Sequence, residues 1–360
     1  ILFNIILFGF IGQVAWAVEN VYFNTFLFNY IGGTADDIAK MVAASAIAAV
    51  VTTFIMGTLS DKLDRRKIFI SGGYIIWGFT VAVFAFISRE NIGKLFNISD
   101  TSKVVAATVC VVIIMDCVMT FFGSTSNDAA FNAWVTDVTV PENRGTAEAV
   151  LALLPVFATV IVTVAFGVGV EAAGYPACFM FLGALVTICG IIGLFSVKDP
   201  RKGVKQSTNY FSDLIYGFRP SVIKNNAALY LCLASACIFN TAVQVFMPYI
   251  FIYVQHYLKF DLNTFQITTP IIIGGAAAVV GLVVVTILLG KLLDKVGKRI
   301  FVFPAVLLFV AGLVAVFFAK TLLTFVLFAL IMILGYGLLM IILNATVRDY
   351  TPEDKVGQFQ

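Results

Sequence analysis

The chain has 360 residues, of which 61% are hydrophobic and only 12% charged, and its mean hydropathy of +1.00 excludes a soluble globular protein. Its net charge of +3 is too small to indicate a nucleic-acid partner. With one histidine, His256, and six cysteines that all fall in apolar segments, the sequence offers no set of ligands for a metal ion. We therefore expect no enzyme active site, no metal and no cofactor.

Ten apolar segments follow one another along the chain, each close to or above the roughly 20 residues that cross a bilayer. They cover residues 1–31, 37–60, 67–88, 104–135, 146–170, 175–197, 227–257, 264–290, 300–319 and 321–347. The sequence thus predicts an all-α, multi-pass membrane protein with the lipid bilayer as a partner. Three of the segments are too long to cross straight, so tilts or kinks are expected.

The positively charged residues assign a side of the membrane to each loop. If the loop after segment 37–60 faces the cytoplasm and sidedness alternates, 17 of the 23 Lys and Arg residues lie on the cytoplasmic side and six on the other. Loops rich in Lys and Arg stay on the cytoplasmic side of a membrane. We therefore predict a protein of the cell membrane whose loops at 61–66, 198–225 and 291–299 are cytoplasmic.

Two stretches of the chain recur in its second half. The loop GTLSDKLDRRK at 57–67 matches GKLLDKVGKRI at 290–300, and NAWVTDVTVPENRG at 132–145 matches NATVRDYTPEDKVG at 344–357. Because the equivalent stretches lie six helices apart, one half of the chain is a copy of the other. This predicts an N-terminal six-helix bundle over 1–197, a cytoplasmic central loop over 198–225 and a C-terminal bundle over 226–360. The second bundle holds four of an expected six helices, and we expect the others beyond Gln360 in a longer protein.

The repeated loop resembles the signature loop of the major facilitator superfamily, Gly-x-x-x-Asp-(Arg/Lys)-x-Gly-Arg-(Arg/Lys). The resemblance implies two six-helix bundles, related by a pseudo-two-fold repeat, around a cavity that opens to each side in turn. It assigns gating contacts to Gly57, Asp61, Arg65 and Arg66 in the first copy, and to Gly290, Asp294, Lys298 and Arg299 in the second. The alternative is a loop that only fixes topology by its positive charge. Asp64 replaces the second glycine of the motif, which Gly297 keeps.

Polar residues recur on single faces of three predicted helices. On α-helical geometry, one face of segment 104–135 carries Ser124, Thr125, Asp128 and Asn132. A carboxylate that faces lipid is costly, so this face is predicted to line the cavity. The matching residues on the other helices are Gln13, Trp16, Asn20 and Asn24, with Glu19 at their flank, and Asn240 and Gln244. An aromatic ring beside amides and acids suits a polyhydroxylated solute. Hydrogen bonding between helices is the alternative use of the same residues.

The stretch TSNDAAFNAWVTDVTVPENR at 125–144 is similar to the fourth helix and following loop of the glycoside–pentoside–hexuronide cation symporters, the melibiose permease type. That resemblance implies that Asp128 contacts both solute and cation and that Thr125 lies beside the cation. The paired carboxylates of sodium-using members fall at Ala49 and Thr53, so a proton is favoured over sodium. Asp128 and Glu19 are the candidate ion-coupling residues. Asp116, on another face of the same segment, is assigned first to a contact with a neighbouring helix.

We therefore predict a secondary active transporter that moves a small polar solute, a sugar or glycoside, by alternating access coupled to protons or another cation, and that acts as a monomer. Two alternatives stay open. An exporter or carrier of amphipathic, lipid-like compounds would have an apolar cavity wall in place of converging Asp, Asn, Gln and Trp residues. A non-transporting receptor on the same scaffold would bind a solute without moving it.

Overall fold

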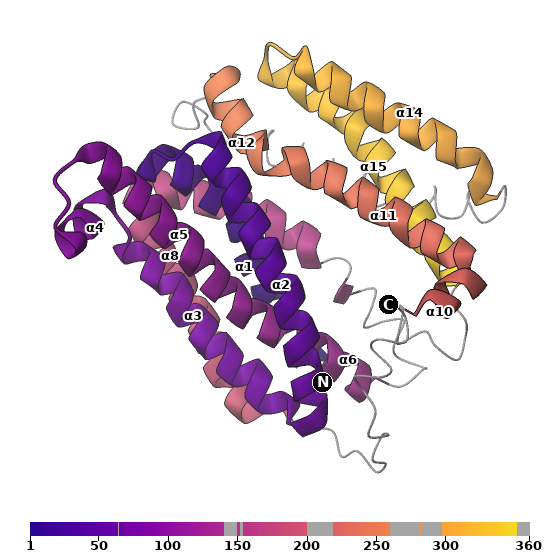
Figure 1. The fold of residues 1–360 in the computed structure, drawn as a ribbon, viewed down its shortest axis with the longest axis horizontal. Coiled ribbons are helices and arrows are strands. Elements are labelled where there is room, and N and C mark those ends of the chain that lie inside the picture. Colours follow the sequence, from indigo (N-terminus) through magenta and orange to yellow (C-terminus); the bar gives the residue numbers. More distant parts are fainter. Residues whose placement is uncertain are drawn as a thin grey trace. The chain divides into compact units, whose positions relative to one another are not determined.

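The computed structural model describes residues 1–63, 65–139, 150–151, 154–199, 219–259, 281 and 297–350. All regular elements in these ranges are helices, and they belong to two compact units, Ile1–Gln206 (unit 1) and Ser207–Gln360 (unit 2) (Figure 1). The predicted two-bundle organisation with a central loop stays a prediction, because most of 198–225 lies outside the described residues.

Eight helices in the described ranges are long and apolar enough to cross a membrane: Leu2–Ile31, Ala35–Gly57, Ile68–Phe86, Thr101–Val135, Leu154–Ser196, Ala227–Tyr249, Arg299–Phe317 and Leu323–Leu343. The predicted count of ten is therefore not confirmed. One predicted segment, 264–290, lies outside the described residues except for Gly281. Two others, 146–170 and 175–197, fall together in Leu154–Ser196, where Gly174 has a φ of +80°. This left-handed backbone, which glycine adopts readily, breaks the helical path and lets two helices meet there.

Unit 1 contains α1 (Leu2–Val18), η1 (Glu19–Phe23), η2 (Phe26–Ile31), α2 (Ala35–Leu63), η3 (Ile68–Gly72), α3 (Gly73–Val83), η4 (Phe84–Phe86), α4 (Arg89–Phe96), α5 (Thr101–Gly123), η5 (Ser124–Phe131), α6 (Asn132–Val138), η6 (Val162–Phe166) and α8 (Gly167–Ser196). The η segments are π-helical, except for the 3-10 helix η4. Most of them continue an α-helix, so the long apolar segments change between α-helical and π-helical geometry along their length.

Short polar sequences begin two of these helices. Before α2, Thr34 N donates to Asp37 Oδ2 at 2.9 Å and Asp37 N donates to Thr34 Oγ1 at 3.3 Å, a reciprocal cap. Before α5, Asp100 Oδ1 accepts from the backbone amides of Ser102 and Lys103. The hydrogen bonds from Ser102, together with that from Lys103, hold the pKa of the Asp100 carboxyl below its usual range. These caps satisfy amides that the first helical turn leaves unpaired.

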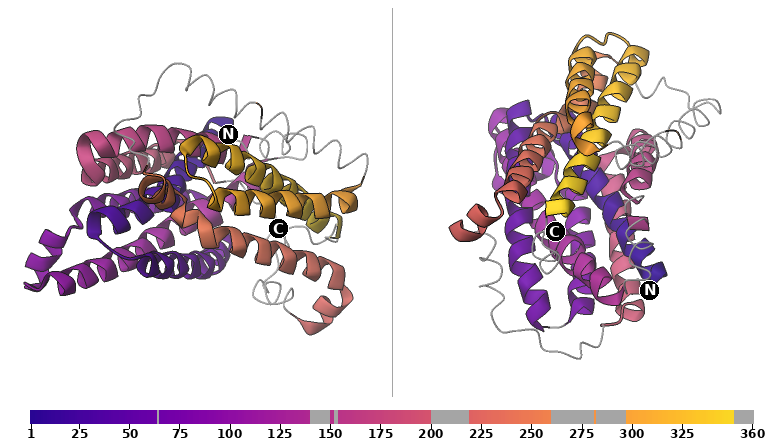
Figure 2. Two further views of the ribbon diagram at one scale, coloured as in Figure 1. Left: turned by 90° about the horizontal axis from the view of Figure 1, so that it is seen from above. Right: turned by 90° about the vertical axis from the view of Figure 1, so that its right-hand side faces the viewer.

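Two glycines bring α3 and α8 into close contact, and the views in Figure 2 show unit 1 as a bundle of long helices. A methyl group added at Gly78 would lie 2.5 Å from the carbonyl oxygen of Gly183, and one added at Gly183 would lie 2.6 Å from the carbonyl oxygen of Gly78. Backbones therefore touch here without intervening side chains. Small residues at crossing points are the usual means by which helices pack in a membrane.

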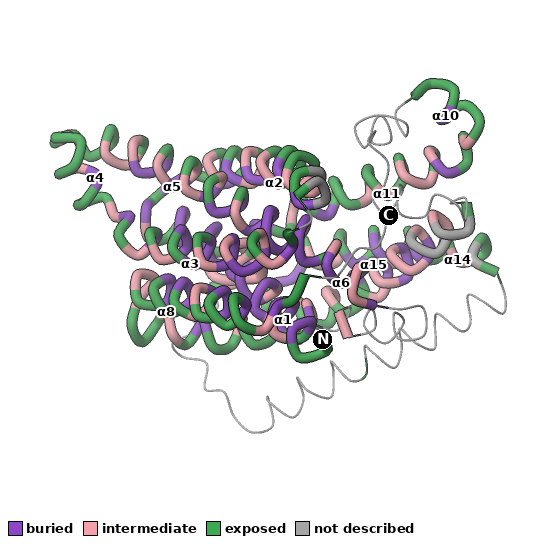
Figure 3. The backbone as a smooth tube through the Cα atoms, turned by 90° about the horizontal axis from the view of Figure 1, so that it is seen from below, coloured by how far each residue is buried: buried purple, intermediate pink, exposed green. Residues whose placement is uncertain are grey.

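Aromatic side chains fill the interior of unit 1 beside this contact. Phe26, Phe84 and Phe179 are fully buried, and the rings of Phe26 and Phe179 meet edge to face with centroids 5.1 Å apart. Figure 3 shows buried positions where the helices of unit 1 face one another and exposed positions on their outer sides. The outer sides are apolar: the Phe195 side chain, for example, is 82% exposed. Such a surface fits a lipid environment.

Unit 2 contains α10 (Pro220–Asn225), α11 (Ala227–Phe246), η7 (Met247–Tyr249), α12 (Ile250–Ile252), η8 (Tyr253–Tyr257), α14 (Lys298–Phe317) and α15 (Leu322–Tyr350). Helices α14 and α15 run side by side (Figures 1 and 2). Val243 of α11, Phe309 of α14 and Met332 of α15 belong to one buried apolar cluster. This cluster joins the neighbouring helices α14 and α15 to α11, which lies about fifty residues earlier in the sequence.

Candidate functional site

The polar string at 124–128 lies in η5, a π-helical segment between α5 and α6. In a π-helix each carbonyl pairs with the amide five residues ahead, so side chains do not follow the 100° step of an α-helix. The single polar stripe predicted on α-helical geometry is therefore divided. Ser124 and Thr125 are buried, Asp128 is half-buried and Asn132 is exposed. The Thr125 hydroxyl donates to the carbonyl of Phe121 at 2.7 Å.

Asp128 is the residue of this string that combines partial exposure with a charge. Its Oδ2 accepts a hydrogen bond from Ser124 Oγ at 2.9 Å, and the Trp16 indole lies beside the same carboxylate. Asn132 donates its side-chain amide to the carbonyl of Asp128 at 3.0 Å. Asp128 thus has few partners inside the protein, and its remaining acceptor positions are available for a solute hydroxyl. Its role stays a prediction, as does that of Thr125.

Asn127 holds the neighbouring aromatic residues in place. Trp16 Nε1 donates to Asn127 Oδ1 at 3.2 Å, and Asn127 Nδ2 donates to Tyr74 Oη at 2.7 Å. Tyr74 Oη in turn donates to the carbonyl of Phe8 at 2.6 Å. The Trp16 ring also packs against Trp77 with centroids 5.0 Å apart. Sequence reasoning did not select Asn127, because its face of the helix cannot be deduced without knowing that η5 is π-helical.

The predicted row on the first helix is also divided. Gln13 is half-buried, Asn20 is exposed, and Asn24 is buried with its amide donating to the carbonyl of Asn20 at 2.7 Å. Asn20 itself donates to the carbonyl of Trp16 at 2.9 Å. In unit 2, Asn240 and Gln244 are exposed on α11, and Asn240 donates to the carbonyl of Ala236 at 2.9 Å. Their convergence with the residues of unit 1 stays a prediction.

Glu19 faces α2 and α5. Its Oε1 accepts hydrogen bonds from Ser45 Oγ at 2.9 Å and from Thr120 Oγ1 at 3.2 Å. About two turns beyond Ser45 on α2, Thr53 donates to the carbonyl of Ala49 at 2.8 Å, and neither of these two residues carries a charge. The acidic group near α2 therefore comes from the first helix.

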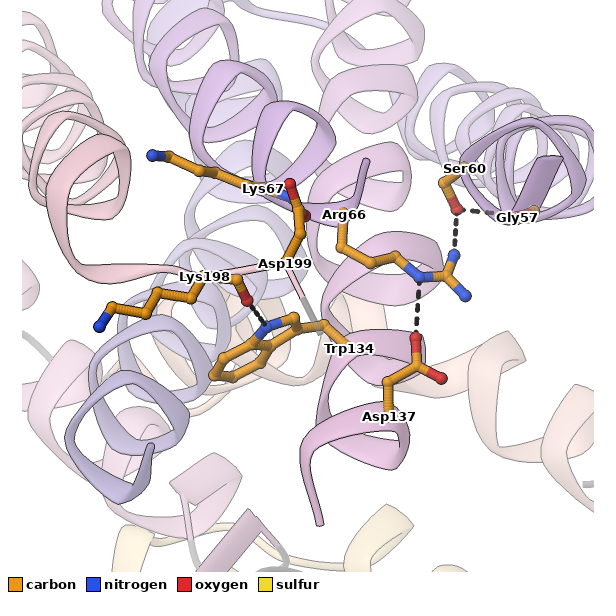
Figure 4. Close-up of polar contacts among 8 residues, drawn as sticks. All are labelled: Gly57, Ser60, Arg66, Lys67, Trp134, Asp137, Lys198 and Asp199. Carbon is orange, nitrogen blue, oxygen red and sulfur yellow. Dashed lines mark hydrogen bonds and ion pairs between the residues drawn. The ribbon is translucent and has the colours of Figure 1, made fainter. Parts of the chain in front are cut away.

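The first signature loop forms a buried polar network (Figure 4). Arg66 is 3% exposed, and its Nε lies 3.2 Å from Asp137 Oδ2. The same guanidinium donates to Ser60 Oγ, and Ser60 donates to the carbonyl of Gly57 at 3.0 Å. A buried guanidinium is tolerated when a carboxylate and further acceptors satisfy it. The network therefore ties the end of α2 to the end of α6.

Two backbone contacts extend this network toward the end of α8 (Figure 4). Lys67 N donates to Asp199 Oδ1 at 2.7 Å, and Trp134 Nε1 donates to the carbonyl of Lys198 at 3.0 Å. Among the other predicted gating residues, Arg65 and Arg299 are exposed. Gly290 and Asp294 lie outside the described residues, as do the side chains of Asp61 and Lys298.

Residues 5–360 match the Major Facilitator Superfamily. One similar solved structure is that of a bacterial homolog to the human lysosomal transporter Spinster, in an inward-facing and unoccupied conformation, with a TM-score of 0.58 and 14% sequence identity. That match covers 97% of this chain and 77% of the other. At this identity the likeness shows the fold alone. No curated protein matches the chain.

Proposed function

We propose that this chain, which belongs to the major facilitator superfamily and is therefore a secondary transporter rather than an enzyme, moves a sugar or glycoside in symport with protons or another cation. The observation that carries the proposal is the half-buried Asp128 carboxylate beside the Trp16 indole inside the helical bundle of unit 1. An aromatic ring covers the C–H face of a sugar, and a carboxylate accepts hydrogen bonds from its hydroxyls.

The positions around Asp128 support the same assignment. Asn20 and Asn132 are exposed amides on the two helices that carry Trp16 and Asp128. Asn127 Oδ1 accepts a hydrogen bond from the Trp16 indole N–H, so that the ring loses little freedom when a solute stacks on it. In this proposal Gln13 completes the unit 1 surface, and Asn240 and Gln244 contribute from the other bundle.

The Arg66–Asp137 network is proposed as the gate on the cytoplasmic face of the cell membrane. It joins the ends of α2 and α6 through a charged pair and a hydroxyl. Such polar contacts can be exchanged between two discrete arrangements at little net change in free energy. Opening to either side would then reorganise this network while the interior of each bundle stays packed.

A direct binding measurement tests the proposal. The full-length protein in detergent is titrated with glucose, galactose, sucrose, melibiose and lactose while its tryptophan fluorescence is recorded. One sugar is expected to change the emission saturably, and the change is expected to vanish in Trp16→Phe. It should persist in Trp134→Phe, because Trp134 is buried against the Lys198 carbonyl. If no sugar acts and a lysophospholipid does, the solute is amphipathic. Saturable binding of a sugar without flux in vesicles would instead indicate a receptor.

A further inference from the structure

Two carboxylates meet in the interior of unit 1, between the first helix, α2 and α5. Glu19 is the first residue of η1, Ser45 lies on α2, and Asp116 and Thr120 are one turn apart on α5. Ser45 Oγ and Thr120 Oγ1 lie 2.8 Å apart, and both hydroxyls reach Glu19 Oε1. The Asp116 carboxylate lies close to the hydroxyl of Ser45 and close enough to Glu19 for the two negative charges to repel each other.

This cluster has fewer hydrogen-bond donors than its acceptors need. The hydroxyls of Ser45 and Thr120 supply one proton each, whereas two ionised carboxylates present four oxygens that only accept. Among the described residues no donor reaches Glu19 Oε2 or Asp116 Oδ1, although both atoms are buried. Asp116 is only 1% exposed. Neither carboxylate forms an ion pair with any Lys or Arg residue in the part of the chain that the structure describes.

Two unpaired, mutually repelling carboxylates cannot both stay ionised at this depth. One bound positive charge would remove the repulsion between the two carboxylates. The site has two carboxylates, and the described part of the chain contains no group of three or more His, Cys, Asp or Glu side chains that could hold a metal ion. A proton needs no coordination shell, converts one acceptor into a donor, and can be shared between the two acids. A trapped water would add donors but would leave the repulsion in place.

We propose that Glu19 and Asp116, with Ser45 and Thr120, form the binding site of the coupling proton. The coupling of this proton to solute movement rests on the proposed function. The inference places the proton on Glu19 and Asp116 rather than on Asp128. Other titratable groups that face the pair are Asp128 of η5 and Cys117 of α5. Trp16 lies three residues before Glu19 on the same helix, so a solute on Trp16 is one helical turn from the proton site.

Infrared spectroscopy of the full-length protein in sodium-free vesicles at neutral pH tests the site without any solute. The unaltered protein is expected to show the C=O stretching band of a protonated carboxyl group. Glu19→Gln and Asp116→Asn should each lose this band, because the remaining carboxylate then receives both hydroxyls and the new amide. Asp36→Asn, which removes an exposed acid paired with Lys40, should retain it.

Three results would overturn the proposal. The band could persist in both site variants, it could be absent from the unaltered protein, or added NaCl at constant pH could abolish it, which would assign the site to sodium. Thermal unfolding serves as the control for misfolding. Each isosteric variant keeps one ionised carboxylate, as the pair with its bound proton does, and should melt close to the unaltered protein. A band that behaves as expected in a protein that moves no sugar would contradict the proposed solute while leaving the proton site intact.

Discussion

Arg66 and Asp137 form an ion pair in the interior of unit 1, with Arg66 Nε 3.2 Å from Asp137 Oδ2, although they lie 71 positions apart in the sequence. The side chain of Arg66 is 4% exposed and that of Asp137 is 19% exposed. Loss of either partner removes the oppositely charged group from a side chain that is largely shielded from water. The adjacent Arg65 is exposed, so the two arginines of the loop are a natural matched pair for experiment.

Arg66→Gln is expected to destabilise unit 1 by about 3 kcal/mol, because Asp137 then loses its charged partner. The measurement is thermal unfolding of the full-length protein in detergent. Arg65→Gln changes the same type of residue at an exposed position and should leave the melting temperature within about 1 °C of the original, as surface substitutions usually do. Adding Asp137→Asn to Arg66→Gln should recover part of the loss. Equal effects of the two arginine substitutions would contradict the buried pair.

Asn127→Ala tests the polar contact that orients Trp16. It removes the acceptor of the Trp16 indole and the donor to Tyr74, and we expect a loss of about 1–3 kcal/mol in stability. Asn132→Ala is the matched control, since Asn132 is exposed and bonds to the carbonyl of Asp128. Chemical unfolding at one detergent concentration compares the two. Unfolding of Asn127→Ala and Asn132→Ala at the same denaturant concentration would contradict the stabilising role of the Asn127 contact.

Gly78→Ala tests the close approach of α3 and α8. The added methyl group would meet the Gly183 carbonyl at 2.5 Å, and backbone cannot move aside as a side chain can. We expect a loss of about 1–3 kcal/mol, the usual effect of overpacking. Gly72→Ala is the control, because a methyl group there meets no atom within 4 Å and the backbone is helical. Comparable melting temperatures for the two variants would show that the helices are further apart.

The Asp100 cap predicts how the stability of the protein changes with pH. Hydrogen bonds from Ser102 hold the pKa of Asp100 below its usual range, so the folded protein prefers the ionised carboxyl. The cap therefore contributes stability above the ordinary carboxyl pKa, and this contribution is lost as pH falls through the lowered value. The melting temperature of Asp100→Ala should be lower than that of the unaltered protein at neutral pH, and the difference should shrink below about pH 4. A difference that grows on acidification would contradict this.

The sequence predicts well those features that depend on composition and local pattern. The apolar segments identify the membrane helices, and the repeated loop identifies Gly57 and Arg66. The partner of Arg66 can also be recognised in the sequence, because Asp137 recurs as Asp349 in the second copy of the repeat. That recurrence marks a residue which both halves retain, but only the packing of the signature loop against α6 shows that its partner is Arg66.

Other features depend on geometry that no local pattern encodes. Helical periodicity assumes a constant 100° step, and η5 departs from it over Ser124–Phe131, which moves Asn127 into the interior. The Glu19 cluster joins three helices separated by up to about a hundred residues, so only packing could bring Ser45 to Glu19. The boundary near Gly174 was predicted from the gap between two apolar segments, and the left-handed backbone there is its physical basis.

The most direct test of the account is proton-coupled flux in sealed vesicles of the full-length protein, without sodium. A panel of mono- and disaccharides is added while external pH is recorded. The account predicts that one sugar makes the external medium alkaline, and that Asp128→Asn abolishes this change while Asp36→Asn preserves it. Normal sugar-driven alkalinisation in a well-inserted Asp128→Asn protein would contradict the role given to Asp128. No pH response and no uptake of any traced sugar, with or without sodium, would contradict the sugar symporter itself.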